Sequence, residues 1–336
     1  KRKIMAMIDS PAIKERSTVS MLMFTVILGL LPALFLQIGF FGYQILGNLF
    51  FGIGFALFLE ALCLKLRNYP IRPFILDGSA FVTAWLLIIS VPANIPIWTL
   101  LIGIFFSIVV AKHAYGGIGS NPFNPAMIGY AVLLISFPEI MTNWPISDGF
   151  EIRNFIQFSQ FFSIANINDA YDAIVSATPL DQIKTSLFLG KEVNALPISL
   201  STLSSYQMIA ILYFLGGIFL VYKKVITWHL PLSLILSIYI FSGLLHLYDQ
   251  NTYMSPLFHL LNGATFLAAF FIITDPVSSP TTLKGKIIFR ILIGLITVII
   301  RNYGGYPDGI AFAVIFLNIC VPLIEKFTQP KVFGYE

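Results

Sequence analysis

Long apolar runs separated by short polar segments make up most of the chain. A transmembrane helix needs about 20 apolar residues, with a range of roughly 17–25, and several of the runs are of that length. The pattern predicts an all-α polytopic membrane protein with ten spans: Ser20 to Leu36, Gln44 to Leu64, Gly78 to Val91, Ile97 to Ala111, Pro125 to Phe137, Tyr206 to Tyr222, Pro231 to Leu247, Gly263 to Thr274, Ile287 to Ile300 and Gly309 to Ile324.

The composition agrees with this class. Hydrophobic residues are 57% of the chain and charged residues 11%, whereas a soluble domain has roughly 25% charged residues. The net charge of +4 is modest, and the basic residues form no dense patch with aromatics, which argues against nucleic-acid binding. The first apolar run has no cleavage site of small residues, so it predicts a retained helix and not a secretory signal.

The distribution of cations orients the spans. Ten spans place both termini on one side of the membrane, and that side then carries 16 of the 20 Lys and Arg residues. Because loops on the cytoplasmic side are enriched in Lys and Arg, both termini are predicted to be cytoplasmic.

One loop, Pro138 to Ser205, is far longer than the others and falls on the opposite side. It carries seven acids and three bases. A loop longer than about 12–15 residues is usually functional or disordered. Its apolar residues favour an ordered cap on the membrane domain: Phe155, Ile156, Phe158, Phe161, Phe162 and Ile164.

The two halves of the chain contain stretches that resemble each other. GSAFVTAWLLIISVP from Gly78 aligns with GATFLAAFFIITDP from Gly263, and Pro122 maps to Pro307 at the same offset of 185. Five spans in each half give the halves opposite orientations, as in inverted-repeat transporters. The predicted division is 1–137 for the first membrane repeat, 138–205 for the extracytoplasmic loop and 206–336 for the second repeat.

The segments beginning at Gly78 and Gly263 are short for membrane spans, with 14 and 12 residues. Paired short helices of this kind mark the central site in repeat transporters. The freed backbone groups must then be satisfied by protein or by a water-lined cavity.

The long loop contains the stretch YDAIVSATPLDQIK, in which Thr178 is flanked by small residues. Pro179 removes a backbone donor and favours an extended conformation at Thr178. From the residues alone, Thr178 is either an ordinary loop threonine or an accessible site of attachment.

Four stretches carry a resemblance to a known family: GGIGSNPFNPAMIGYAVLLISFP, DAIVSATPLDQIK, ATFLAAFFIITDPV and YGGYPDGIAFAVIFLNICVPLIEKFTQPKVFGY. In order and over nearly the whole chain, they resemble the RnfD proteins of Rnf-type electron transport complexes. Those complexes are ion-translocating oxidoreductases between ferredoxin and NAD. The NqrB protein of the sodium-pumping NADH:quinone reductase is a more distant relative.

The resemblance implies a covalent flavin. In the family, a Thr in a motif close to Asp-Gly-x-Ser-Gly-Ala-Thr carries FMN through a phosphoester bond. Asp172, Ala177 and Thr178 match this motif, while Ala173, Val175 and Ser176 replace the Gly, Ser and second Gly. The resemblance therefore implies that Thr178 carries FMN, attached by a flavin transferase, and that Asp172, Ser176 and Ala177 belong to the binding segment.

The same resemblance implies a place in the bacterial inner membrane, with the Thr178 loop periplasmic. Electrons must cross a hydrocarbon core about 30 Å thick, and the sequence has no Cys cluster or haem-like His pair. Partner subunits are therefore expected to supply the other cofactors.

Acids within or beside the spans are candidates for ion passage. Glu60 lies in FALFLEALCL, where an intramembrane carboxylate costs about 2.5–3.5 kcal/mol and is a functional hypothesis. A Glu reaching the interface near Lys65 is the alternative. Asp77 and Asp308 precede helices and are expected to be caps. Asp308 is also assigned to the ion pathway. Asp275, which lies at the end of a helix, is assigned to it as well.

Other polar landmarks receive structural interpretations. Cys63 and Cys320 are expected to pack inside helices. The stretch GGIGSN at Gly116 lacks the strand and Lys-Ser/Thr of a phosphate loop, so it is expected at a helix break. The four histidines, His113, His229, His246 and His259, are expected at the membrane interface.

The sequence thus predicts the flavin-bearing membrane component of a Na⁺- or H⁺-translocating electron transport complex, which is not catalytic alone. Inverted halves with short central helices also fit a channel or permease without redox activity, and a purely structural component of the complex is a third alternative.

Overall fold

The structure is a computed structural model, and it describes residues 19–117, 119–145, 149–150, 175–189 and 204–329. The helices before the long loop are α1 (Val19–Phe41), α2 (Gln44–Leu66), α3 (Ile71–Ile75), α4 (Ser79–Ser90), α5 (Ile97–Phe105), the π-helix η1 (Phe106–His113), α6 (Pro125–Ser136) and α7 (Pro138–Thr142). Those after it are α9 (Pro179–Phe188), α10 (Ser205–Tyr222), α11 (His229–Tyr248), α12 (Pro256–Leu261), α13 (Thr265–Leu267), the π-helix η4 (Ala268–Ile272), α14 (Leu283–Tyr303) and α15 (Ile310–Thr328).

The only strands in the described part of the chain are β1 (Trp144–Pro145) and β2 (Val175–Ser176), which pair antiparallel. The prediction of an all-α membrane protein is confirmed apart from this short pair. Two predictions for the long loop lie outside the described residues: the apolar cap around Phe155, and the position of Asp172.

Each of the ten predicted ranges contains helix. Six helices are long and apolar enough to cross a membrane by length and composition: α1, α2, the stretch Ile71–Ser90 that joins α3 and α4, α10, α11 and α15. The apolar helices Ile97–His113 and Pro125–Ser136 are shorter. The described chain is therefore that of a multi-pass membrane protein, and the count of ten crossings stays a prediction.

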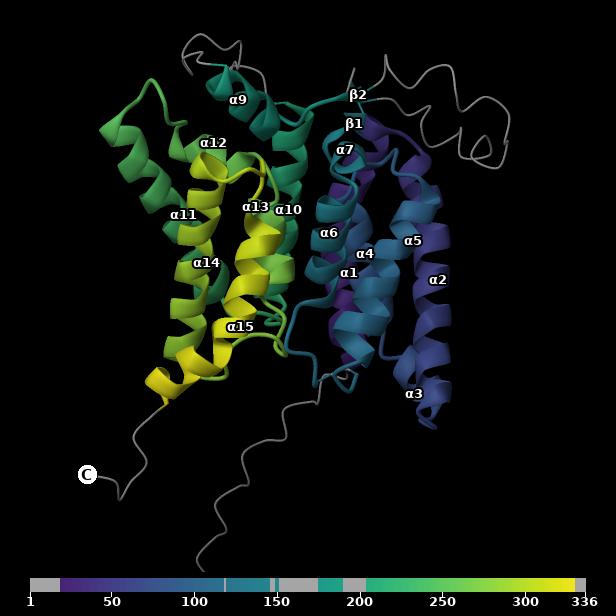
Figure 1. The fold of residues 1–336 in the computed structure, drawn as a ribbon. Coiled ribbons are helices and arrows are strands. Elements are labelled where there is room, and N and C mark those ends of the chain that lie inside the picture. The colour runs from purple at the N-terminus through teal and green to yellow at the C-terminus, as the bar shows by residue number, and fades with distance from the viewer. Residues whose placement is uncertain (1–18, 118, 146–148, 151–174, 190–203, 330–336) are drawn as a thin grey trace, which may run out of the picture.

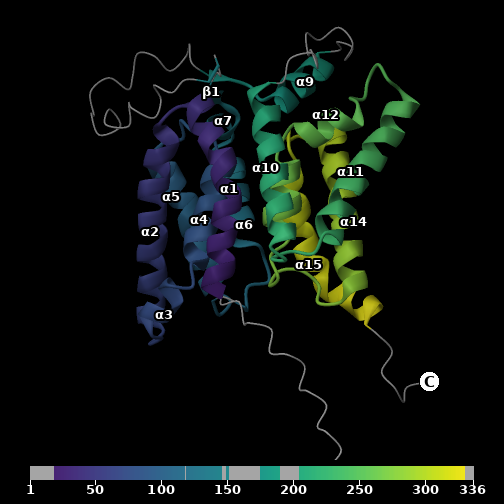
Figure 2. The same cartoon turned by 180° about the vertical axis from the view of Figure 1, so that it is seen from behind.

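The helices form two bundles that lie side by side, α1 to α6 in one and α10 to α15 in the other (Figures 1 and 2). The bundles meet where α1 packs on α10 and α6 packs on α15. At the first contact, a Cβ atom added to Gly216 would overlap the carbonyl oxygen of Gly29. The two backbones therefore touch through small residues, as is common between membrane helices.

The short elements that flank the long loop lie at one end of the two bundles (Figure 1). The helices α7 and α9 and the β1–β2 pair lie at one end, whereas the start of α1 and the end of α15 lie at the opposite end (Figure 1). The sides carry large exposed apolar residues, including Phe24, Phe50, Phe58 and Leu323. Such sides suit contact with lipid.

The two predicted short helices are present. Gly78 and Gly263 precede them with φ angles of 78° and 74°, a left-handed conformation that favours glycine. The first short helix is α4, with 12 residues, and the second is α13 continued by η4, with 3 and 5 residues. Both halves of the chain thus interrupt a helix at positions 185 apart.

Two cations near the ends of predicted spans are buried. Lys112 lies in η1 and Arg290 in α14, and they are 2% and 1% exposed. Arg290 donates hydrogen bonds to the carbonyl oxygens of Ile273 at 2.6 Å and Lys286 at 2.8 Å. Ile273 follows the end of η4, where a cation satisfies carbonyl groups that the helix leaves free.

Candidate functional site

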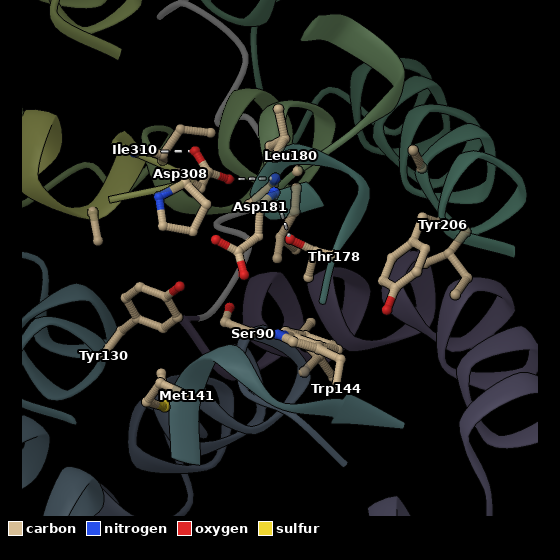
Figure 3. A pocket seen from close by; sticks show the side chains of 18 of the residues that line it. Ser90, Tyr130, Met141, Trp144, Thr178, Leu180, Asp181, Tyr206, Asp308 and Ile310 are labelled. Carbon is tan, nitrogen blue, oxygen red and sulfur yellow. Dashed lines mark hydrogen bonds between the residues drawn. The ribbon is translucent and has the colours of Figure 1, made fainter. Parts of the chain in front are cut away.

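A cavity lies between the two bundles, at the end where α7 and α9 are found (Figure 3). Residues of α1, α4, α6, α10, η4 and α15 line it, together with the start of α9. Its volume is about 140 Å³, close to the roughly 150 Å³ of a protein cavity that binds benzene. The space therefore suits about one aromatic ring.

Thr178 stands at the edge of this cavity, as the N-cap of α9. Its φ and ψ of −63° and 157° are extended, as predicted from the proline that follows. Its Oγ1 atom accepts a hydrogen bond from the backbone N–H of Asp181 at 3.3 Å. The half-buried hydroxyl therefore lies at the positive end of a helix.

The helix that Thr178 begins is fixed to the second bundle. Lys184 Nζ donates hydrogen bonds to the carbonyl oxygens of Ile300 and Tyr306. On the apolar side of α9, Ile183 packs with Phe258. These contacts place α9 over the second bundle (Figure 1), and Thr178 at its start lines the cavity between the bundles.

Three aromatic residues form one wall of the cavity: Phe41, Trp144 and Tyr206. The ring centroids are 6.1 Å apart for Phe41 and Trp144, 5.2 Å for Phe41 and Tyr206, and 6.2 Å for Trp144 and Tyr206. The strand pairing sets Trp144 opposite Ser176. We call these three residues the aromatic wall.

Two carboxylates reach the cavity, from Asp181 and Asp308 (Figure 3). Burial raises the pKa of the Asp181 carboxyl above its usual 3.8, and the charge of Lys184 acts against that rise. Of the residues that the structure describes, none donates a side-chain hydrogen bond to the Asp181 carboxylate. Asp181 thus brings to the cavity an acidic group that Lys184 compensates only in part.

Asp308, in contrast, has many partners. Its Oδ1 atom lies 3.1 Å from Arg301 Nη2, and its Oδ2 atom accepts a hydrogen bond from Ala264 N at 2.8 Å. The same guanidinium donates to the carbonyl oxygen of His259 at 2.7 Å and to Thr265 Oγ1 at 3.0 Å. Asp308 and Arg301 together hold the start of the interrupted helix α13.

Asp77 and Asp308 both accept hydrogen bonds from the start of a helix, as expected of caps, but the N-cap positions themselves are Gly78 and Gly309. Asp77 Oδ1 accepts hydrogen bonds from Ser79 N at 2.7 Å and Ser79 Oγ at 2.6 Å, at the start of α4. Asp308 Oδ1 accepts from Ile310 N at 3.3 Å, at the start of α15. Asp308 differs from Asp77 because it also accepts a hydrogen bond from the start of α13. The sequence does not reveal this contact between two elements.

Glu60 belongs to a separate buried cluster in the first bundle. Its Oε1 atom lies 2.8 Å from Lys112 Nζ, and its Oε2 atom lies 2.9 Å from His113 Nε2. Lys112 also donates to Ser79 Oγ at 2.8 Å. The Glu60 side chain is 2% exposed, so the alternative of a Glu that reaches the interface near Lys65 is wrong.

Asp275 has partners as well. Its carboxylate accepts hydrogen bonds from Val277 N at 3.1 Å and Ser278 Oγ at 2.9 Å. The residue follows η4, where the helix dipole disfavours an anion. The partners of Asp275 are thus provided by the turn that follows it.

The structure therefore brings together only part of the predicted set. Thr178 and Asp308 line one cavity. Ser176 and Ala177 lie just before it, where Gln182 Nε2 donates to Ser176 Oγ at 3.3 Å and to Ala177 O at 2.8 Å. The sequence reasoning missed the aromatic wall and Asp181, because aromatic residues at span ends are common interface anchors and give no separate signal.

Two of the four histidines differ from their prediction. His113 and His259 are 7% and 4% exposed. His113 lies against the Glu60 carboxylate, and the carbonyl oxygen of His259 accepts a hydrogen bond from Arg301. Cys63 is buried and free, as predicted for packing, and Cys320 is half-buried and free. Within the described ranges, no group of three or more His, Cys, Asp or Glu side chains is arranged to hold a metal ion.

Comparison with known proteins adds the family. The model of the NQR2, RnfD, RnfE family matches residues 6–334. The chain belongs to this family. It is 42% identical to a protein of Mannheimia succiniciproducens over 346 residues, covering 98% of this chain and 97% of the relative.

A relative from Psychromonas ingrahamii is 44% identical over 341 residues, with 97% of each chain covered. Another, from Vibrio vulnificus, is 42% identical over 349 residues, with 97% of this chain and 98% of the relative covered. All three relatives are named as the same component of an ion-translocating oxidoreductase complex. The family resemblance inferred from the sequence is thereby confirmed.

Proposed function

We propose that this chain is the membrane component of an ion-translocating electron transport complex and carries FMN on Thr178 through a phosphoester bond. The observation that carries the proposal is the position of the Thr178 hydroxyl. It lies at the edge of a cavity between two membrane bundles, in a chain whose relatives are named as a component of an ion-translocating oxidoreductase complex.

The start of α9 fits a flavin phosphate, while the Asp181 carboxylate beside it opposes the phosphate charge. The N-terminus of a helix favours negative charge and offers free backbone N–H groups, and Thr178 is the N-cap of α9. The aromatic wall offers ring faces to a planar group, and the cavity of about 140 Å³ beside it has room for about one of the three fused rings of a flavin. Thr178, the backbone at the start of α9 and the aromatic wall are therefore the groups that would hold FMN.

FMN supplies one- and two-electron redox chemistry that the side chains of this chain lack. The chain's own residues position and shield it. A covalent bond keeps the group at its site on a face exposed to bulk solvent, where a dissociable cofactor would be diluted. We assign to the chain a relay of electrons between ferredoxin and NAD redox partners, coupled to Na⁺ or H⁺ translocation by the whole complex.

The proposal includes partners. A flavin transferase attaches FMN at Thr178, and other membrane and peripheral subunits supply the remaining electron carriers and the catalytic sites. The chain is thus part of a translocase and not an enzyme alone.

We also propose ten crossings, arranged as two inverted five-helix halves, 1–137 and 206–336, joined by the loop 138–205. Helix starts support the repeat: α2 begins at Gln44 and α11 at His229, while α6 begins at Pro125 and α15 at Ile310, each pair 185 positions apart. The start of α1 and the end of α15 lie at the same end of the molecule (Figure 2), which supports an even number. The cation distribution favours cytoplasmic termini and a periplasmic Thr178 in the bacterial inner membrane.

For ion passage, Asp275, Glu60 and Asp308 remain our proposed positions, and each carboxylate already has protein partners that an ion would displace. Asp275 is the most direct to test, because its partners are a backbone N–H and a hydroxyl and not a cation. Asp275→Asn should impair ion transport by the complex and leave the flavin content unchanged. Undiminished transport would remove Asp275 from the pathway.

The decisive experiment is a mass measurement of the proteolytic peptide that contains Thr178. An added FMN mass supports the proposal, and an unmodified peptide contradicts it. Thr178→Ala should abolish ultraviolet-excited flavin fluorescence of the denatured protein, and Thr178→Ser should retain part of it because the hydroxyl remains. Thr185→Ala, an exposed position on the same helix, is the matched control and should keep full fluorescence.

The same measurement separates the alternative function. A channel or permease with inverted halves needs no flavin, so it predicts an unmodified Thr178 and ion flux without any electron donor.

A further inference from the structure

We propose that the aromatic wall is the binding site for the flavin ring, with Trp144 and Tyr206 as the residues that contact it. This inference rests on the proposed function for the identity of the ligand, and it assigns a role to residues that the Thr178 motif does not include.

The strand pair provides the first argument. Trp144 lies opposite Ser176 in the antiparallel pair. The strand β2 ends at Ser176, two positions before Thr178. The pairing therefore holds Trp144 close along the chain to the attachment residue, and Trp144 and Thr178 line the same cavity.

Tyr206 approaches from the other bundle and is also held in place. It lies in the first turn of α10, next to a capping box in which Ser204 Oγ accepts from Gln207 N at 3.4 Å and Gln207 Oε1 accepts from Ser204 N at 3.2 Å. Its ring centroid is 5.2 Å from that of Phe41, which is 5% exposed. A paired strand and a capped helix therefore present their rings toward one cavity.

The rings are not merely packing partners of each other. Trp144 and Tyr206 are both only half-buried, and both line the cavity that Thr178 also lines (Figure 3). Electron-rich indole and phenol rings stack readily on planar heteroaromatic groups. A tethered planar ring is therefore the ligand that the wall and the hydroxyl accept together.

Such a contact has an optical consequence. An indole or phenol ring in contact with an excited flavin quenches its fluorescence by donating an electron, which returns when the flavin relaxes. The bound flavin of the native protein should therefore fluoresce weakly, and it should become brighter when the protein is denatured.

The test compares the full chain with variants at Trp144. Native fluorescence is measured per flavin, with the flavin counted after denaturation. We expect Trp144→Leu to raise native fluorescence severalfold at unchanged flavin content, and Trp144→Tyr to keep most of the quenching because a donor ring remains. Trp228→Leu is the matched control, because Trp228 is 64% exposed and lies outside the cavity lining, and it should leave the signal unchanged.

The proposal is overturned if Trp144→Leu carries flavin whose native fluorescence equals that of the unmodified protein. If Trp144→Leu does not give a monodisperse protein, Tyr206→Leu replaces it, with the same expected rise and the same contradicting result.

A second measurement separates this inference from the proposed function. Thr178→Ala protein, which lacks the attachment hydroxyl, is titrated with riboflavin. If the Thr178→Ala protein quenches riboflavin fluorescence saturably and the Thr178→Ala, Trp144→Leu double variant does not, the ring site is supported. This holds even if the peptide at Thr178 proves to be unmodified. Equal quenching in the two proteins refutes the ring site, even if Thr178 does carry FMN.

Discussion

Lys112 and Glu60 form an ion pair of 2.8 Å inside the first bundle, between side chains that are 3% and 2% exposed. Removing one partner of a buried pair leaves an uncompensated charge and costs about 3–5 kcal/mol, whereas removing both can be neutral. His113, 2.9 Å from the other oxygen of Glu60, offers the remaining carboxylate a second partner.

Lys112→Met should therefore lower the melting temperature of the purified protein clearly, and the double variant Glu60→Gln, Lys112→Met should recover much of the loss. Thermal unfolding in detergent measures both. Lys65→Met, at an exposed position of α2, is the control. A single variant that melts like the unmodified protein would show that the pair contributes nothing to folding.

Asp308 gives a second prediction, because it neutralises Arg301, whose side chain is 1% exposed, and accepts a hydrogen bond from the start of α13. Asp308→Ala removes both interactions and should destabilise the protein by about 3–5 kcal/mol. Asp308→Asn keeps an acceptor oxygen but loses the charge, so its melting temperature should fall between those of the unmodified protein and Asp308→Ala.

A matched control for Asp308 is Asp249→Ala. Asp249 also accepts hydrogen bonds within a turn, from Asn251 N at 2.9 Å and Thr252 Oγ1 at 2.6 Å, but it has no cation partner among the described residues. If both alanine variants lose the same stability, the Arg301 pair adds nothing beyond capping.

The sequence located the helices well because length and apolarity alone decide where a chain can cross a membrane. The ends were harder to place. α1 continues to Phe41 beyond the predicted Leu36, and α14 begins at Leu283 before the predicted Ile287. Neither end is set by the apolar pattern, because a helix can continue past the hydrocarbon core.

The site was less accessible to sequence reasoning, because its parts are distant along the chain. Thr178 was identified through the family resemblance of the stretch around it, but the pairing of Trp144 with Ser176 joins two distant parts of a long loop. Glu60 and Lys112 are 52 positions apart. The buried cluster depends on the packing of η1 against α2, which local composition does not determine.

Lys184 gives a third prediction, on the placement of α9. Its ammonium group donates to the carbonyl oxygens of Ile300 and Tyr306, and hydrogen bonds to charged groups contribute about 1.5–3 kcal/mol each, less when partly exposed. Lys184→Met should loosen α9 from the second bundle. Faster hydrogen exchange of peptides from α9, measured by mass spectrometry, would show this.

The control for Lys184 is Lys223→Met, which removes a cation at an exposed position after α10 and should not change exchange in α9. Exchange rates of α9 that are equal in both variants would contradict the anchoring role of Lys184.

Asp181 gives a fourth prediction, on pH. Burial raises the pKa of its carboxyl above the usual 3.8, with Lys184 opposing the rise, so the folded protein binds this proton more tightly than the unfolded chain does. The free energy of unfolding therefore decreases as the pH rises from 3.8 through the raised pKa of the Asp181 carboxyl. At higher pH the destabilisation by the ionised carboxylate stays constant. Because Asn has no such cost, Asp181→Asn should equal or exceed the unmodified protein in stability near neutral pH.

The advantage of Asp181→Asn should shrink as the pH falls toward about 4, where the carboxyl of the unmodified protein takes up its proton. Melting temperatures across this pH range measure the difference, with the exposed Glu139→Gln on α7 as control. A phosphoester on Thr178 adds negative charge beside the same carboxylate and raises its pKa further, so the advantage should be larger in flavin-loaded protein than in the Thr178→Ala background. A variant that is less stable than the unmodified protein near neutral pH would mean that the Asp181 carboxylate stabilises the fold through its charge.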